Sequence, residues 1–400
     1  MLSVPNQTKL KRARMQRIFF ALIAVFAIYT FAYHNLSYGN AQPSYDLKQK
    51  NILHYTESST RLIKSYTTGR HSDAHTSPRK PVTLSHLAEK VPDSQKSNST
   101  SRNITIKVDK PKIMITTTRD YLCGDTRLGN KLYMVAATYA AAVKYNYQFV
   151  LLKDQRCIWI YVLKDLFTTF NTSVTYLPYS QIRLWRRVEE GPVNEYVPIQ
   201  PQTINFSVSG YRQSWKHFQS EAEQDGVRRL FRLNTKYEIK ANRLLHSARA
   251  KFSAGKDAIF IGVHMRLGDL LKPHRVKHGR RTANATFYQS AFKAASLHFQ
   301  TDVIFVVATD SVDIGRTILG DLQTTHNVFW ANGTAEEDFA ALTKCNHSII
   351  SGGSFSFWVG WLAGGETWYF ADLARPDSKF YLHHHPKEFF LPSWKPVHIY

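Results

Sequence analysis

The chain contains 400 residues, of which 43% are hydrophobic and 20% are charged, a composition that is typical of a globular protein with a large core and excludes a disordered one. The net charge of +22 would suit nucleic acid, but no zinc, helix-turn-helix or RNA-binding signature accompanies it, so we expect no nucleic-acid partner. Three cysteines are too few for a disulfide scaffold and lack metal-ligand spacing. If one bridge forms, Cys123 with Cys157 is the first candidate.

The N-terminal sequence predicts a membrane anchor. Five basic residues between positions 9 and 17 precede an uncharged, mostly apolar run over 18–36, which as a helix would span about 28 Å, close to the hydrocarbon thickness of a bilayer. The positive-inside rule places residues 1–17 in the cytoplasm and the rest of the chain in a lumen. A cleaved signal peptide is the alternative, but the run is long for one and no small-x-small site follows it.

Residues 37–109 predict a flexible luminal stem. This segment is rich in Ser, Thr, Lys and Asn, so it can bury too little apolar surface to fold. Six Asn-x-Ser/Thr triplets are candidate glycosylation sites: Asn98, Asn103, Asn171, Asn205, Asn284 and Asn332. A seventh triplet begins at Asn346 in a predicted core segment, and we expect that residue to stay unmodified.

From residue 110 onward, strand and helix patterns alternate, which predicts an α/β protein with parallel sheets and right-handed crossovers. In the first part, the predicted elements are strands over 112–118 and 148–152, a strand-like patch over 173–177, and helices over 130–145, 218–231 and 237–252. Most of the segment between 158 and 214 is aromatic and irregular, and its pattern does not resolve into elements.

The alternation is more regular in the second part. Predicted strands cover 259–265, 303–308, 328–330 and 348–350, and predicted helices cover 286–299, 312–319, 336–344 and 355–363. Two such regions indicate two Rossmann-like domains, 110–225 and 226–400, that face each other across a cleft.

The segment IGVHMRLGDLL at 261–271 carries the strongest functional signal, because an apolar strand runs directly into His264, Arg266, Gly268 and Asp269. Ligands of open α/β sheets bind at the carboxyl ends of such strands. An arginine there suits a phosphate or carboxylate, and the glycine lets the backbone bend close to a ligand. The alternative is an internal salt bridge between Arg266 and Asp269.

Two further strand or helix ends point polar groups toward the predicted cleft. Gly129 and Asn130 stand at the entrance to the first long helix, where unpaired amides favour an anion, unless Asn130 only caps that helix. Asp310 follows the apolar strand at 303–308 and either accepts hydrogen bonds from a base or ribose, or caps the next helix.

The segment SIISGGSFSFW at 348–358 predicts a stronger anion site. Two glycines permit close backbone approach, and the helix that follows opens with Ser354, Phe355 and Ser356, whose amides and hydroxyls suit phosphate oxygens. Arg266 would approach from the neighbouring strand. The alternative is a plain turn in which the serines cap the helix.

Other chemistries are disfavoured. The glycine-rich segments match neither the Walker nor the Gly-x-Gly-x-x-Gly spacing. The histidine run at 383–385 is predicted on a surface tail, and no Asp-x-Asp chelator is present. We therefore expect no metal and no cofactor, so the charge of a bound phosphate must be neutralised by protein groups, above all by Arg266.

In these motifs and their order, the chain resembles the galactoside α-1,2-fucosyltransferases of glycosyltransferase family 11. The resemblance spans 112–394 and rests, in the family's order, on RLGN at 127–130, HMRLGD at 264–269, FVVATDS at 305–311, DFAALTKCNHSIISGGSFSFW at 338–358, LAGGETWYFA at 362–371 and FFLPSW at 389–394. The segment 338–358 is the most specific of these.

The resemblance implies a reaction and a location. The family is similar to fucosyltransferases of the two-Rossmann GT-B type, which are inverting, use GDP-fucose and need no metal. It implies transfer of L-fucose from GDP-fucose to the 2-OH of a terminal galactoside on a glycan. The expected location is the Golgi membrane, in a single-pass type II arrangement with the catalytic part luminal.

Carried over residue by residue, the resemblance implies a donor site. Arg266 would contact the diphosphate, His264 and Asp310 would hold the nucleoside, and Asn130 matches an asparagine that faces the donor sugar in protein O-fucosyltransferases. The remaining donor-site residues are Gly268, Ser354, Phe355 and Ser356.

Two positions depart from the family's pattern. The family usually has a second arginine where this chain has Leu267, and a glycine where it has Thr126. The first departure argues against a two-arginine clamp. Together they motivate the alternative of a membrane-tethered binding protein without turnover; a fucosyl linkage to another acceptor is a further alternative.

The implied mechanism needs no general acid, because GDP is a good leaving group, unlike the oxygen that leaves in glycoside hydrolysis. The main task is to stabilise charge on the β-phosphate, which falls to Arg266 and the amides near Ser354. Asp269 is the preferred base, and its rival role is to fix Arg266. The other candidates for the base are Asp125, Glu366 and Glu388.

Overall fold

A computed structural model describes residues 112–190 and 195–400 of the chain. The predicted anchor at 18–36, the stem at 37–109 and the triplets at Asn98 and Asn103 lie outside these residues. Within the described part, no helix combines the length and the apolar character that a membrane crossing requires.

The first half is built on a five-stranded parallel sheet with the strand order β3-β2-β1-β5-β4. Its strands are β1 (Met114–Thr117), β2 (Gln148–Lys153), β3 (Thr175–Pro178), β4 (Arg186–Val188) and β5 (Phe206–Val208). Because β1 pairs with β2 on one side and with β5 on the other, the strand order reverses at β1.

The helices of the first half are α3 (Arg119–Cys123), α4 (Leu128–Tyr145), α5 (Ile158–Leu166), α6 (Thr169–Thr172), α7 (Tyr179–Ile182) and α8 (Glu221–Leu230), with a 3₁₀ turn η1 (Trp215–Phe218). The alanine-rich helix α4 is buried along most of its length, and Asn146 ends it in the left-handed conformation, which asparagine tolerates well. A capping box between Ser220 and Glu223 starts α8, which packs against α4.

The second half is built on a six-stranded parallel sheet with the order β11-β10-β9-β6-β7-β8. Its strands are β6 (Ile259–Met265), β7 (Val303–Thr309), β8 (Asn327–Trp330), β9 (His347–Ile350), β10 (Thr367–Phe370) and β11 (Lys395–Val397). The strand order reverses between β6 and β9, and β6 and β7 are buried along almost their whole length, as central strands of a covered parallel sheet are.

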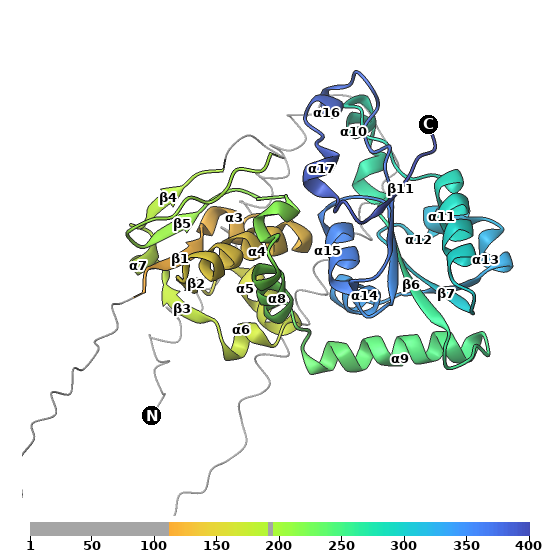
Figure 1. Ribbon diagram of the computed structural model, residues 1–400, viewed down its shortest axis with the longest axis horizontal. Helices are drawn as coiled ribbons and strands as arrows, with labels where there is room; N and C mark the ends of the chain where they lie inside the picture. Colours follow the sequence, from red (N-terminus) through yellow and green to blue (C-terminus); the bar gives the residue numbers. More distant parts are fainter. Residues whose placement is uncertain (1–111, 191–194) are drawn as a thin grey trace, which may run out of the picture. The chain divides into compact units, whose positions relative to one another are not determined.

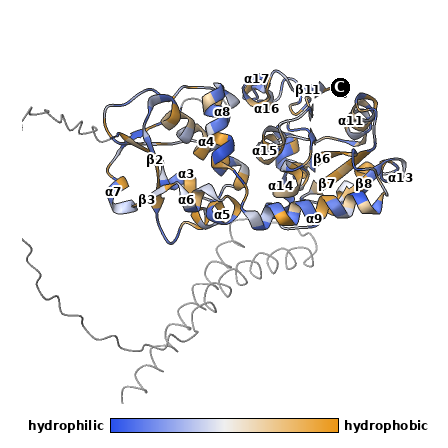
Figure 2. Ribbon diagram, turned by 60° about the horizontal axis from the view of Figure 1, so that its bottom comes forward, coloured by the Kyte–Doolittle hydropathy of each residue, from blue (hydrophilic) through white to orange (hydrophobic). Residues whose placement is uncertain are grey.

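The helices of the second half are α9 (Thr235–Lys251), α10 (Pro273–Lys277), α11 (Ala285–His298), α12 (Val312–Leu319), α13 (Leu322–Thr325), α14 (Ala335–Thr343), α15 (Ser354–Ala363), α16 (Lys379–Leu382) and α17 (Pro386–Phe389), with a 3₁₀ turn η2 (Gly268–Leu271). Figure 1 shows this sheet between α14 and α15 on one side and α11 on the other. In Figure 2, hydrophobic colour runs along β7, whereas α9 carries mixed colours.

The predicted α/β class and the alternating elements are confirmed. Every strand and helix predicted from 259 to 363 is present, with ends shifted by no more than two residues. The segment that the pattern did not resolve contains α5, α6, α7, β4 and β5, and β5 pairs with β1 at the centre of the first sheet. Within the first half α8 packs on α4, and within the second half α9 packs on α14.

The two halves meet where the N-terminal ends of α4 and α15 touch. The indole of the fully buried Trp358 donates to the carbonyl of Gly129 at 3.0 Å. Aromatic rings surround this contact, with the Tyr133 and Phe357 ring centroids 4.7 Å apart and those of Phe218 and Trp358 5.5 Å apart. These aromatic side chains form an apolar core that holds the two halves together next to the N-terminal ends of α4 and α15.

The loop before α4 is held by covalent and polar contacts. Cys123 and Cys157 form a disulfide, which confirms the predicted pair. The ammonium of the fully buried Lys131 donates to the carbonyls of Tyr121 at 2.6 Å and Gly124 at 2.9 Å. Burial lowers the pKa of Lys131 to about 8, so both carbonyl contacts stabilise a charge that burial disfavours.

The glycosylation triplets within the described residues differ in accessibility. Asn171 and Asn332 are exposed, whereas Asn205 accepts from the amide of Met114 at 2.8 Å and Asn284 caps α11. Asn346 is also exposed, because it sits in the turn before β9, so the expectation that it lies in the core is wrong. Its side-chain oxygen accepts from the amide of Phe260 at 2.9 Å.

Removing the disulfide should destabilise the first half. The bridge closes a loop across 34 positions, so Cys123→Ser should lower the free energy of unfolding by about 2–4 kcal/mol, as the loss of a comparable loop constraint does. Chemical denaturation with and without a reducing agent measures this. A reductant should shift the wild-type transition to that of Cys123→Ser and leave the variant unchanged; an equal shift in both proteins would contradict the assignment.

Gly129 should tolerate no side chain. A Cβ there would lie 2.5 Å from the backbone carbonyl carbon of Ser354, a distance that real Cβ atoms do not show. Gly129→Ala should therefore separate α4 from α15 and lower the free energy of unfolding by about 1–3 kcal/mol, as overpacking does. Gly255→Ala is the matched control, because no atom lies within 4 Å of its Cβ. Equal stability of the two variants in denaturation curves would refute the close contact.

Candidate anion and donor site

The candidate site lies at the switch point of the second sheet. Here β6 and β9 run side by side, and the crossovers leave their carboxyl ends in opposite directions, which is where open α/β sheets place ligands. Arg266 directly follows β6, and Gly352 and Gly353 follow β9 and lead into α15. The sequence-predicted arginine and the predicted anion-binding helix start are therefore neighbours.

The turn after β9 requires its glycines. Gly352 and Gly353 have φ angles of 107° and 88°, a region that residues with a Cβ rarely adopt. The hydroxyl of Ser351 joins the two strand ends, since it accepts from the amide of Arg266 at 2.7 Å and donates to the carbonyl of His264 at 3.0 Å. This contact fixes the backbone of Arg266 against the start of α15.

The side chain of Arg266 is engaged by two carboxylates. Its guanidinium forms ion pairs with Asp269 and with Asp310. Arg127 lies 3.0 Å from the same Asp269 oxygen and 4.0 Å from Asp310. The internal salt bridge between Arg266 and Asp269, one of the two sequence-based alternatives, is therefore present. We call these four residues the arginine-carboxylate cluster; its formal charges sum to zero.

Gly268 and Leu267 shape this cluster rather than an open ligand surface. A Cβ on Gly268 would lie 2.5 Å from a carboxylate oxygen of Asp310, so the glycine makes room for that carboxylate. The other Asp310 oxygen accepts from the amide of Leu267 at 2.9 Å. The side chain of Leu267 is fully buried, and Asp310 binds neighbouring backbone and Arg266 instead of capping α12.

His264 and Ser356 lie beneath the site, within the core. The Ser356 hydroxyl donates to the carbonyl of Gly352 at 2.6 Å, and His264 Nδ1 lies 2.6 Å from the Ser356 hydroxyl oxygen. Since a hydroxyl has one proton, Nδ1 of His264 carries a hydrogen and donates. Burial, with the charge of Arg266, lowers the pKa of His264 to about 3, so the ring is neutral.

This burial corrects two sequence-based roles. Ser356 is fully buried and His264 is 6% exposed, so the Ser356 hydroxyl does not face a phosphate and the imidazole does not face a nucleoside in this structure. Phe355 stacks on the His264 ring, with centroids 4.6 Å apart. The three side chains support the turn after β9 from below, and the groups left to meet a ligand are the amides of the first turn of α15.

Asn130 links the halves at the edge of the site. Its side-chain oxygen accepts from the Ser354 hydroxyl at 2.5 Å and from the side-chain amide of Gln213 at 2.8 Å. Arg127, not Asn130, occupies the N-cap position of α4, so Asn130 does not cap its own helix. The structure thus brings Asn130 and Ser354 together, as the prediction of a shared site requires.

A small pocket of about 80 Å³ opens beside Ser354. Gly353, Ser354 and Arg280 line it from the second half, together with His384 and Glu388, and Gln213 lines it from the first half. Sequence reasoning missed Arg280 and Gln213, because neither follows a predicted strand or opens a predicted helix. Only the tertiary fold brings them to the start of α15.

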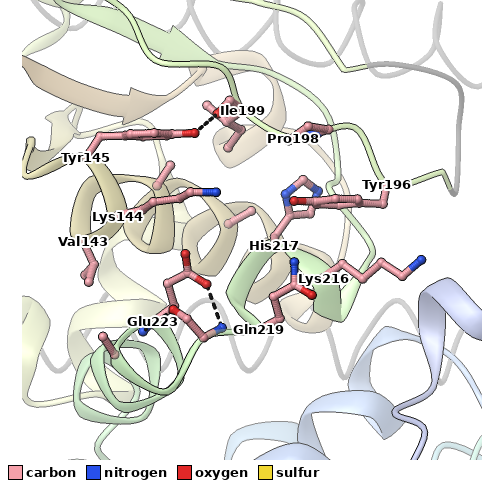
Figure 3. A pocket seen from close by; sticks show the side chains of 14 residues that line it. Val143, Lys144, Tyr145, Tyr196, Pro198, Ile199, Lys216, His217, Gln219 and Glu223 are labelled. Atoms are coloured by element: carbon pink, nitrogen blue, oxygen red, sulfur yellow. Dashed lines mark hydrogen bonds between the residues drawn. The ribbon is translucent and has the colours of Figure 1, made fainter.

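A larger pocket of about 470 Å³ lies in the first half (Figure 3). Tyr196 and His217 form its aromatic wall, with ring centroids 4.9 Å apart, and the Tyr145 hydroxyl donates to the carbonyl of Ile199 at 3.1 Å. Burial and then the charge of Arg212 lower the pKa of His217 to about 3, so this ring is neutral as well. The pocket contains none of the sequence-predicted site residues.

The candidate bases occupy different places. Glu366 precedes β10, at the amino end of the sheet, and pairs with Lys395 at 2.9 Å, so it lies away from the carboxyl-end site. Asp125 is exposed in the loop before α4. Glu388 lines the small pocket and pairs with Lys216 at 2.5 Å. Asp269 belongs to the arginine-carboxylate cluster.

No group of three or more His, Cys, Asp or Glu side chains in residues 112–190 and 195–400 is arranged to hold a metal ion.

Comparisons with known proteins give named relatives. Over 199 residues the chain is 38% identical to galactoside alpha-(1,2)-fucosyltransferase 1 of Rattus norvegicus, a match that covers 47% of this chain and 50% of the relative. Over 274 residues it is 29% identical to the protein of the same name from Ateles belzebuth, covering 68% of this chain and 72% of the relative. The chain spans about half the length of the rat and mouse relatives that it matches.

Solved structures give more distant matches. The fucosyltransferase NodZ from Bradyrhizobium is similar with 16% identity and a TM-score of 0.42, over 62% of this chain and 92% of that one. POFUT1 in complex with GDP is similar with 12% identity and a TM-score of 0.38, over 66% of this chain and 99% of that one.

The family assignment comes from the sequence. The model of glycosyl transferase family 11 matches residues 151–398, which is more than half of the chain and includes β6, β9 and the start of α15. The motifs that suggested this family from the sequence lie, with one exception at 127–130, inside the matched region. The chain belongs to glycosyl transferase family 11.

Proposed function

We propose that this chain is an inverting fucosyltransferase that transfers L-fucose from GDP-fucose to the 2-OH of a terminal galactoside on a glycan. The observation that carries the proposal is family membership together with the position of Arg266 beside the first-turn amides of α15, at the switch point of the second sheet. The galactoside alpha-(1,2)-fucosyltransferase names of the relatives support the donor sugar and the acceptor class.

The proposed chemistry is a displacement at the anomeric carbon of fucose. The galactose hydroxyl attacks, its proton passes to a base, and the bond between fucose and the β-phosphate breaks, so negative charge accumulates on GDP. Positive groups aimed at that charge contribute most to such a step. Arg266 and the first-turn amides of α15 are the proposed stabilising groups, supported by their adjacency at the ends of β6 and β9.

Binding a diphosphate at Arg266 requires an exchange of partners. The guanidinium is held by Asp269 and Asp310, so a phosphate that contacts it must displace at least one carboxylate. Asp310 would then be free to accept hydrogen bonds from the nucleoside, the role that its place after β7 supports. Asn130 and Ser354 would face the fucose from the edge between the halves.

Two carboxylates are proposed as the base. Asp269 would be released when Arg266 turns to phosphate, whereas Glu388 already lines the pocket beside Ser354. The proposal keeps Asp269 as first choice, because its carboxylate is the one that the donor would free next to the leaving group. Its rival role, holding Arg266 in position, is the one supported by the ion pair.

The proposed location is the Golgi membrane. The basic residues before the apolar run at 18–36 support a single-pass type II arrangement, with the described α/β part in the lumen. The disulfide between Cys123 and Cys157 supports an oxidising compartment, since such bonds are rare in the cytosol.

A second candidate function is a tethered glycan- or nucleotide-sugar-binding protein without turnover. The observation in its favour is that the guanidinium of Arg266 is already neutralised by two carboxylates and that Leu267, where the family usually has an arginine, is buried. GDP release from GDP-fucose, measured with a panel of β-galactosides and other acceptors, separates the alternatives. Release only with β-galactosides supports the first, release with other acceptors supports another linkage, and binding without release supports the second.

Arg266→Ala should nearly abolish transfer. Loss of a preorganised donor to the developing charge typically costs about a hundred- to a thousandfold in rate, and the measurement is kcat for GDP release with a β-galactoside acceptor. Arg316→Ala is the matched control, because Arg316 belongs to α12 and its guanidinium packs over the ring of Trp330 in β8. Retention of a tenth of wild-type turnover by a folded Arg266→Ala protein would remove the assignment.

The base should be revealed by the pH dependence of the rate. If Asp269 is the base, the acidic limb of the kcat/KM profile should disappear in Asp269→Asn and persist in Glu388→Gln. If Glu388 is the base, the acidic limb should disappear in Glu388→Gln and persist in Asp269→Asn. An Asp269→Asn profile of unchanged shape but reduced height would show that the carboxylate positions Arg266 and does not take the proton.

A further inference from the structure

Arg280 is a partly buried cation that forms no ion pair with another described residue. It follows α10, lines the small pocket with Gly353 and Ser354, and its Nε is buried without a hydrogen-bond partner. No carboxylate in the described part of the chain lies within ion-pair distance of its guanidinium. A buried charge in this condition costs free energy, and an anion in the pocket would offset that cost.

The ring of Phe380 holds this guanidinium without neutralising it. The centre of the guanidinium lies 3.9 Å from the ring centroid, a cation-π contact that fixes position and leaves the positive charge available. Burial, and then the charge of Arg275, lowers the pKa of Arg280 to about 10, so the group stays charged at neutral pH.

The other titratable groups that face the pocket do not cancel this charge. Glu388 is already paired with Lys216 at 2.5 Å and accepts from the Ser214 hydroxyl at 3.1 Å. Burial, followed by the charge of Arg280, lowers the pKa of His384 to about 4, so its ring is neutral. His385 lies 3.8 Å from Glu195. The pocket therefore keeps the net positive charge of Arg280.

Arg280 differs in this respect from Arg266. The arginine-carboxylate cluster has two cations and two anions, so an arriving diphosphate meets no excess charge there. Arg280 lies in the pocket that Gly353 and Ser354 line at the start of α15, where the first-turn amides also favour negative charge.

We propose that Arg280 is a donor-binding residue whose guanidinium contacts the diphosphate of the nucleotide sugar from the small pocket at the start of α15. This inference rests on the proposed function for the identity of the nucleotide. Arg280 supplies the charge that draws the diphosphate in, and Arg266 joins the contact after it leaves a carboxylate.

Binding of GDP, guanosine and inorganic pyrophosphate tests the role of Arg280. Arg280→Met should weaken GDP and pyrophosphate by about ten- to a hundredfold, the value of a hydrogen bond to a charged group, and leave guanosine unchanged. The affinity of Arg280→Lys for GDP and pyrophosphate should lie between those of the wild type and Arg280→Met. Methionine keeps the contact with Phe380, and thermal unfolding of each variant confirms that it is folded.

Arg281→Met is the matched control, because the adjacent guanidinium packs 3.9 Å from the Tyr400 ring and does not line the pocket. It should bind GDP within twofold of the wild type. Equal GDP affinity in folded Arg280→Met and Arg281→Met would overturn the inference while leaving fucosyl transfer intact. Arg280-dependent pyrophosphate binding without any preference for GDP over UDP would support the anion site and overturn the proposed donor.

Discussion

The close contact between the N-terminal ends of α4 and α15 is the constraint on which the rest of the site depends. Gly129 lies against the backbone of Ser354 and Phe355 with no space for a Cβ. Trp358 closes the contact from the core by its hydrogen bond to Gly129. Because the helix ends touch as backbone, the side chains at the rim, Asn130 and Ser354, meet within hydrogen-bond distance. Two helix N-termini therefore direct their unpaired amides toward one region.

Charge balance explains the pairing seen around Arg266. Two helix N-termini and the guanidinium groups of Arg127 and Arg266 would repel one another if no anion were nearby. Asp269 and Asp310 supply that negative charge. A diphosphate carries comparable charge, so it can replace a carboxylate without leaving the arginines unpaired. No carboxylate of the described residues pairs with Arg280, so a diphosphate in the small pocket would supply the missing negative charge there.

One short segment forms a wall of both pockets. Gln213 lines the small pocket and bonds to Asn130, whereas Lys216 and His217, a few residues on, line the large pocket. Lys216 also pairs with Glu388 of the second half. A ligand in the small pocket thus contacts the chain segment that shapes the large one. In the proposed two-substrate reaction, a substrate in each pocket would contact this one segment, which Lys216 ties to the second half.

The sequence predicts those parts of this protein whose signal is local. Long apolar strands such as β6 and β7 and the glycine pair before α15 were identified because burial and positive φ angles select residue types directly. The three-residue strands β4 and β5 were missed, because a buried strand of that length has no periodicity of its own.

Side-chain roles at the site were less predictable, for a related reason. Which hydroxyl of α15 faces a ligand depends on the helix rotation relative to the sheet, and that rotation turns Ser356 toward His264 and Ser354 toward Asn130. The fold of the chain after α10 brings Arg280 to the site, and the residues next to it in sequence form no motif that predicts a ligand. Its proposed role follows from its surroundings: the Phe380 ring holds the guanidinium, and no carboxylate of the described residues forms an ion pair with it.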